Sequence, residues 1–172
     1  VTAVGGEKPI FMVLQGFGWA ELGPAANHDK AVMPTFEQSR FMAYDAIVHG
    51  STGLLYWGTH YTRKPSPFFS DLKSLISELA ALQEVLASRS VTSSERASVA
   101  EPAGGVRLLH KRTEAGRNFL IVVNETPGEV TATVKTPGIA ASSLRRLFEN
   151  ATVPVTGGLV RLPLAGYGVA VL

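Results

Sequence analysis

Two short apolar segments of the chain each end in side chains of the types that hold sugars. The first, residues 9–19, reads PIFMVLQGFGW, and the second, residues 53–61, reads GLLYWGTHY. Aromatic faces stack on the C–H faces of sugar rings, while indole and amide N–H groups donate hydrogen bonds to hydroxyls. The candidate carbohydrate contacts are Gln15, Trp19, Tyr56, Trp57, His60 and Tyr61. The competing interpretation is that Trp19 and Trp57 pack in a core and that His60 and Tyr61 pack within a loop.

Carboxylates near these segments in sequence offer acid–base chemistry. Glu21 and Asp29 lie in the loop after the first segment, and Asp71 lies near the start of the last expected helix. A positioned pair of carboxylic acids can transfer protons, and Glu21 with Asp29 is the candidate catalytic pair. The alternative is that these are solvated loop acids and a helix-start charge favoured by the helix dipole. Asp45 falls inside an expected helix, where a salt bridge or solvent contact is the interpretation.

Composition excludes several other classes of function. The 172 residues are 45% hydrophobic, which permits a true core, and the net charge is only +2. No run of Lys and Arg is longer than a pair, so we expect no nucleic-acid partner. The absence of cysteine removes disulfides, thiol nucleophiles and cysteine-based metal sites. The four histidines lack metal-ligand spacing, and we expect neither a metal nor a cofactor.

The sequence also bears on membranes and on the ends of the chain. No apolar stretch approaches the ~18 residues of a membrane span, so we expect a soluble protein without a membrane partner. No charged region followed by an apolar core opens the given sequence, so we expect no signal peptide in it, and the compartment stays unknown. Val1 stands only a few residues before an expected strand, so we expect either a piece of a longer protein or an unusual start.

The first half of the chain predicts an alternation of strands and helices. Residues 10–15 and 53–57 are apolar runs without alternation, typical of strands covered on both faces in a parallel sheet. Thr35 and Gln38 have capping-box spacing at the start of a helix that Gly50 ends. A second helix is predicted from leucines and an isoleucine at three- and four-residue spacing, namely Leu72, Leu75, Ile76, Leu79, Leu82 and Leu86. This order is the βαβα rhythm of a parallel sheet.

The second half predicts an antiparallel β-sandwich. Its short β-rich runs are residues 106–111, 118–124, 130–135, 144–148, 159–162 and 168–172, and turn-forming residues separate them. We place a domain boundary near residues 88–94. The predicted domains are a partial (β/α) barrel segment over residues 1–88 and a C-terminal β-sandwich over residues 89–172. The fold class is therefore α/β plus all-β.

Two parallel strands with two helices leave a sheet with unsatisfied edges and a partly exposed face. Other strands are therefore missing from the first half, or copies of the chain associate to supply them. We predict self-association.

The quoted residues resemble parts of a glycoside hydrolase. The first half is similar to the last two βα units of a (β/α)₈ catalytic barrel, and the second half to the small β-sandwich that often follows such barrels. The matching stretches of the first half are residues 8–9, 15–19, 34–35, 40–44, 49–50 and 53–58. Those of the second half are residues 119–124 and 147–150. The resemblance covers most of the chain.

The resemblance implies hydrolysis by two carboxylic acids, about 5–5.5 Å apart in retaining enzymes and about 6.5–9.5 Å apart in inverting ones. Gln15 stands where many relatives carry a nucleophilic Glu, and a neutral amide cannot attack an anomeric carbon. The usual acid/base position lies upstream of residue 1. The resemblance therefore implies a site that is incomplete in this sequence.

Three functional hypotheses follow. The chain derives from a glycoside hydrolase acting on a β-linked glycan such as cellulose or β-glucan, and is active only when oligomerisation or missing sequence completes its site. Alternatively, it is a non-catalytic carbohydrate-binding module. In the third hypothesis it is a structural fragment whose half-barrel serves oligomerisation. The sequence leaves open which glycan is bound and with which stereochemical outcome.

Overall fold

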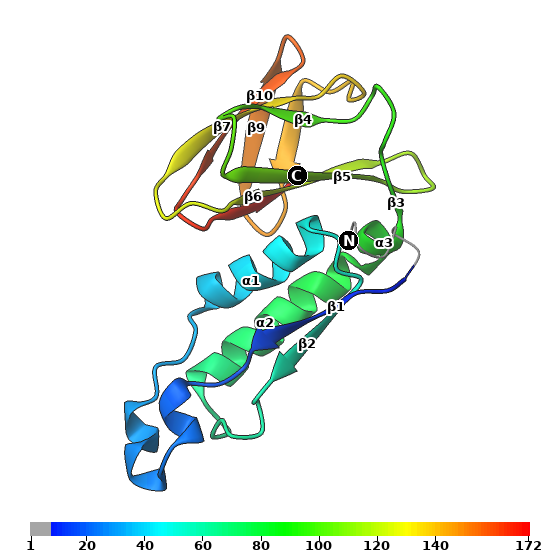
Figure 1. Cartoon of the computed structure of the whole chain (residues 1–172). Helices are drawn as coiled ribbons and strands as arrows, with labels where there is room; N and C mark the ends of the chain where they lie inside the picture. Colours follow the sequence, from blue (N-terminus) through cyan, green and yellow to red (C-terminus); the bar gives the residue numbers. More distant parts are fainter. Residues whose placement is uncertain (1–7) are drawn as a thin grey trace. The chain divides into compact units, whose positions relative to one another are not determined.

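The computed structural model describes residues 8–172, except for the side chains of residues 25 and 26. The chain divides into two compact units, Val1–Leu79 (unit 1) and Ala80–Leu172 (unit 2). A mixed α/β part with a parallel strand pair precedes antiparallel sheets, as Figure 1 shows, and this confirms the predicted fold class. The predicted domain boundary after residue 88 stays a prediction.

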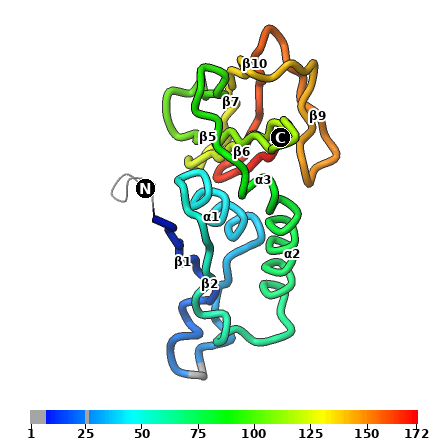
Figure 2. Tube along the Cα trace, turned by 90° about the vertical axis from the view of Figure 1, so that its right-hand side faces the viewer, coloured from blue at the N-terminus to red at the C-terminus, as the bar shows by residue number. Residues whose placement is uncertain are grey.

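Unit 1 contains the predicted parallel pair. Strands β1 (Phe11–Gln15) and β2 (Gly53–Trp57) run parallel, with Gln15 opposite Trp57 at their C-terminal ends. Along the chain, two 3-10 turns and helix α1 connect β1 to β2, and α2 follows β2, as the tube in Figure 2 traces. The bounds of these elements are η2 (Trp19–Leu22), η3 (Ala25–Lys30), α1 (Phe36–Val48) and α2 (Pro67–Ala81).

Helix α1 begins as the sequence predicts. The hydroxyl of Thr35 accepts a hydrogen bond from the Gln38 amide at 3.2 Å, and the Gln38 side chain accepts one from the Thr35 amide at 2.9 Å. This reciprocal capping box satisfies two otherwise unpaired donors. After the helix, Gly50 has φ 95°, a left-handed conformation that ends the helical path at little cost for glycine.

Helix α2 departs from the predicted leucine stripe. Leu72 and Leu75 are buried, but Ile76 is exposed, and Glu78 occupies a buried position of the packed face. The helical path also breaks after Ala81 and resumes in α3 (Gln83–Ala87). None of the helices in the described part of the chain has the length and apolar character needed to cross a membrane.

Unit 2 consists of two antiparallel sheets around a common core, the predicted sandwich (Figure 1). One sheet has the strand order β4-β7-β10-β9-β8 and the other β11-β6-β5-β3. The strands are β3 (Arg89–Ser90), β4 (Ser98–Glu101), β5 (Val106–Arg112), β6 (Asn118–Asn124), β7 (Val130–Lys135), β8 (Ser143–Arg146), β9 (Ala151–Thr156), β10 (Leu159–Leu164) and β11 (Val169–Val171). Val122 of one sheet and Val134 and Val160 of the other are fully buried in that core.

Strands β3, β4 and β9 were not predicted from the sequence. Strands β3 and β4 are short, and β9 contains Pro154, which cannot donate to a ladder and so weakens a strand pattern. Strand β8 ends at Arg146, two residues before the predicted end, because residues 147–150 form the turn into β9.

Candidate functional site

The candidate site begins where β1 and β2 end. Their parallel register brings the two C-terminal ends to one edge, and the amide of Gly16 donates to the carbonyl of Trp57 at 2.9 Å. In parallel sheets this edge carries the loops that bind ligands. The chain after β1 then turns Phe17 inward, where its side chain is buried.

Four ring-bearing side chains beside Phe17 form a connected group, which we call the aromatic cluster: Trp19, Trp57, His60 and Tyr61. The rings of Trp19 and Trp57 each meet the Phe17 ring edge to face, at centroid distances of 5.1 Å in both cases. The Trp57 ring lies 6.3 Å from His60 and 6.0 Å from Tyr61, and the last two rings are 3.9 Å apart. Edge-to-face pairs are favourable arrangements that hold the rings relative to one another.

The aromatic cluster is exposed around a buried centre. Trp19 is 72% exposed, Trp57 45% and Tyr61 42%, whereas Phe17 is 6% exposed. Gly58 makes this packing possible, since it has φ 88° and a Cβ there would lie 2.6 Å from Cδ1 of Phe17. The cluster is therefore a surface platform that rests on the buried ring of Phe17. In the described part of unit 1, its rings do not fill a core.

Gln15 and Tyr56 lie apart from the platform surface. The Gln15 side-chain amide donates to the carbonyl of Phe17 at 2.8 Å, so it holds the loop that carries the cluster. The Tyr56 hydroxyl donates to the backbone carbonyl of Ser39 in α1 at 3.5 Å, and burial raises the pKa of Tyr56 to about 12. The contacts of both residues are internal, although both were predicted as sugar contacts.

A pocket of about 390 Å³ in unit 1 contains the predicted acids. Its lining includes Glu21, Asp29 and Asp71 together with Tyr61, so the pocket adjoins the aromatic cluster. Thr62, Arg63 and Phe68 also line the pocket and were not among the predicted site residues. Thr62 and Arg63 lie in the loop after β2, and Phe68 lies at the start of α2. No sequence motif marks these residues, because they reach the pocket only through the fold.

The two candidate catalytic acids have different surroundings. Glu21 is buried, and its Oε2 accepts hydrogen bonds from the amide of Gly18 at 2.9 Å and from the hydroxyl of Thr62 at 3.4 Å. Asp29 is exposed and pairs through Oδ1 with Arg63 at 3.0 Å. Glu21 thus caps the short η2 turn, and Asp29 is partly neutralised at the pocket rim.

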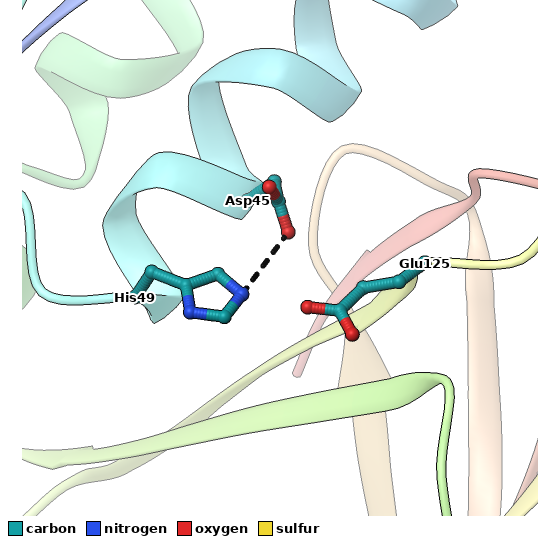
Figure 3. Close-up of side chains that lie close together, drawn as sticks. All are labelled: Asp45, His49 and Glu125. Atoms are coloured by element: carbon teal, nitrogen blue, oxygen red, sulfur yellow. Dashed lines mark ion pairs between the residues drawn. The ribbon is translucent and has the colours of Figure 1, made fainter.

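Asp45 lies in ion-pair range of a histidine, and the pair is a salt bridge when that imidazole is protonated. Its Oδ1 lies 3.7 Å from Nε2 of His49, four residues later on the same helix (Figure 3). Pairs at this spacing are ordinary features of a helix surface. Within each unit taken by itself, the described residues bring together no three His, Asp or Glu side chains at metal-binding distances.

No protein-family model and no curated protein sequence matches this chain. Solved structures do match its fold. A structure of AmyP in complex with maltose matches 94% of this chain and 40% of its own, at 12% identity and a TM-score of 0.63. An alpha-amylase from Anoxybacillus matches 95% and 37%, at 12% identity and a TM-score of 0.60. A GH30 endoxylanase from Clostridium papyrosolvens C71 matches 99% and 42%, at 14% identity and a TM-score of 0.56.

The chain thus spans about two fifths of the length of these enzymes. At such identities the likeness concerns the fold. Over most of the chain, that fold is similar to the fold of glycoside hydrolases, and the finer match to the last two βα units of a barrel stays a prediction.

Proposed function

We propose that this chain binds carbohydrate through the aromatic cluster, as a protein related in structure to glycoside hydrolases. The observation that carries the proposal is the exposed platform of Trp19, Trp57, His60 and Tyr61 at the C-terminal edge of two parallel strands. Exposed rings held by a buried neighbour suit stacking on a pyranose, because little side-chain freedom is lost when the sugar binds. The AmyP structures hold maltose and maltotriose, which supports an oligosaccharide as the ligand class.

Hydrolysis is the second candidate function, and the pocket beside the platform favours it. Glu21 and Asp29 both line that pocket, so they are the acids to which catalysis is assigned. Two contacts weigh against them, since Glu21 serves as a cap through Oε2 and Asp29 pairs with Arg63. Binding is therefore the function that this geometry supports best.

The type of glycosidic linkage stays a prediction. A β-linked glycan is the ligand predicted from the sequence, whereas the similar structures include an alpha-amylase as well as an endoxylanase. Ligands with α- and with β-linkages therefore belong in the same test.

Titration calorimetry of the full chain with maltotriose, xylotriose and cellotriose tests binding. We expect at least one trisaccharide to bind, and Trp57→Ala to weaken its association at least tenfold, or ~1.4 kcal/mol. Tyr167→Ala is the matched control, because Tyr167 is an exposed aromatic residue of unit 2. Binding that survives Trp57→Ala, or no binding of any trisaccharide at millimolar concentration, contradicts the proposal.

Release of reducing sugar from the corresponding polysaccharides tests hydrolysis separately. Turnover that Glu21→Gln or Asp29→Asn abolishes would assign catalysis to this pair. Binding without turnover would leave a non-catalytic binding module.

A further inference from the structure

A second hollow, lined by side chains of the types that bind ligands, lies on unit 2 at the turn that joins β8 to β9. Its volume is about 600 Å³. The side chains that line it are mainly polar, with one aromatic ring: Arg145, Arg146, Phe148, Glu149, Asn150 and Thr152. Guanidinium, carboxylate, amide and hydroxyl groups beside an aromatic face are the groups that recognise sugar rings.

Phe148 is an unusual residue for its position. It has φ 64°, a left-handed conformation that disfavours bulky side chains, and its side chain is 49% exposed. A glycine or asparagine would adopt this turn with less strain. Unlike Tyr167, which shares both features, Phe148 lines the hollow, so its exposed ring is available for contact with a bound molecule.

The charges of the hollow are not balanced. Arg146 pairs through Nη2 with Oε1 of Glu149 at 3.0 Å, whereas Arg145 is exposed and has no ion pair among residues 8–172. The Nε of Arg146 is buried and finds no hydrogen-bond partner in the same part of the chain. The lining thus holds two guanidinium groups and one carboxylate, and this excess of one positive charge favours an anionic ligand.

We propose that this hollow binds an acidic sugar, a uronate residue of a glycan. Phe148 stacks on the apolar face of the pyranose, and Arg145 pairs with its carboxylate. Asn150 and Glu149, which also line the hollow, supply an amide and a carboxylate for the ring hydroxyls. The site lies within unit 2 and shares no residue with the aromatic cluster of unit 1, so it stands independently of the function proposed there.

NMR titration of the full chain with trigalacturonate, xylotriose and acetate tests the ligand class. We expect trigalacturonate to shift the amide signals of residues 145–152 and to bind at least tenfold more tightly than xylotriose. Acetate separates recognition of a sugar acid from binding of a bare carboxylate. Equal affinity for the acidic and neutral trisaccharides, or an equal response to acetate, overturns the proposal.

Two variants locate the site. Phe148→Gly removes the ring and relieves the left-handed strain, so the fold is retained while affinity for trigalacturonate falls at least tenfold. Arg145→Gln is expected to remove the preference for the acidic sugar. The matched control is Tyr167→Gly, since Tyr167 also has a positive φ of 54° and an exposed ring but does not line the hollow. Unchanged affinity in Phe148→Gly overturns the proposal even when the sugar binds.

Discussion

The carboxylate of Glu21 caps a backbone turn and also lines the pocket, and substitutions can separate these roles. Glu21→Ala leaves the amide of Gly18 without its acceptor, and we expect a loss of about 1–3 kcal/mol in the free energy of unfolding. Glu21→Gln keeps an acceptor oxygen and is expected to cost less than half as much. Urea unfolding followed by tryptophan fluorescence measures both, since Trp19 and Trp57 are the only tryptophans of the chain. Equal losses in the two variants would contradict the capping role.

His110 makes the stability of unit 2 depend on pH. Its side chain is buried, Nδ1 accepts from the amide of Ala97 at 3.0 Å, and Nε2 therefore donates to Oδ1 of Asn118 at 3.0 Å. Burial lowers the pKa of His110 below its ordinary value of 6.5, although the bond to Asn118 opposes this. Arg112 and Arg96 lower it further, while Glu95 raises it.

Because the folded pKa is depressed, the unfolded chain binds the proton more readily than the folded chain. The stabilisation from neutral His110 is complete above pH 6.5 and is lost as the pH falls below that value. We expect a slope of up to about 1.4 kcal/mol per pH unit in the unfolding free energy of unit 2. Circular dichroism melts of wild type and His110→Gln between pH 7.5 and 5 measure this slope. A variant with the wild-type pH dependence would contradict the assignment to His110.

At the scale of elements, a buried polar triad joins α1 to α2. Oε1 of Glu78 accepts from Nε of Arg40 at 2.8 Å and from the hydroxyl of Tyr44 at 2.7 Å. Burial raises the pKa of Tyr44, and the bond to Glu78 raises it further, so the phenol stays a donor. The triad explains why the packed face of α2 includes a glutamate.

Removing Glu78 takes away the acceptor that Nε of Arg40 and the hydroxyl of Tyr44 share. We expect Glu78→Ala to lower the unfolding free energy of unit 1 by about 3 kcal/mol, and Tyr44→Phe by about 1 kcal/mol. The matched control is Glu84→Ala, because Glu84 pairs with Arg117 on the surface and such pairs contribute roughly 0–1 kcal/mol. Denaturant midpoints by tryptophan fluorescence and circular dichroism compare the three. A loss in Glu78→Ala no larger than in Glu84→Ala would refute this role of the triad.

At the scale of the whole molecule, unit 2 has the features of an independent folding unit. Its two sheets share one core, and Nζ of Lys111 donates to the carbonyl of Leu86 in α3 at 3.1 Å and to that of Ser88 just after α3 at 2.8 Å. We expect a fragment of residues 80–172 to fold alone with a cooperative melt. Dispersed amide signals in its NMR spectrum would establish this. A collapsed, non-cooperative fragment would show that the division into units does not extend to folding.

Unit 1 carries the feature on which predicted self-association depends. Phe11, Val13 and Leu55 project from β1 and β2 and are exposed, and the sheet has only these two strands among the described residues. Exposed apolar sheet faces and free edges favour association. Light scattering is expected to give a mass above the 18.3 kDa of one chain, and Leu55→Lys to lower it. A strictly monomeric wild-type chain at micromolar concentration would contradict the prediction.

The sequence by itself determined the elements whose signals are local. The capping box at Thr35, the apolar runs of β1 and β2, and β6 and β7 depend on neighbouring residues, and each lies where the pattern predicts. Local chemistry also identified Trp19 and Trp57 as the residues to examine. Whether these residues bind a sugar stays a prediction that the titrations above will test.

Only the tertiary structure decided how those residues meet. Phe17 supports the aromatic cluster only because β1 and β2 pair in parallel register and because Gly58 leaves room for its ring. Neither condition can be recognised from neighbouring residues in the sequence. From the sequence alone, Glu78 is expected on the surface. In the structure it is buried, because Arg40 and Tyr44 of α1 donate hydrogen bonds to it. The hollow at Phe148 forms only because β8 pairs with β9 across a tight turn. The physical reason is common to all three: burial and polar partners come from segments distant in the chain, and no local spacing encodes them.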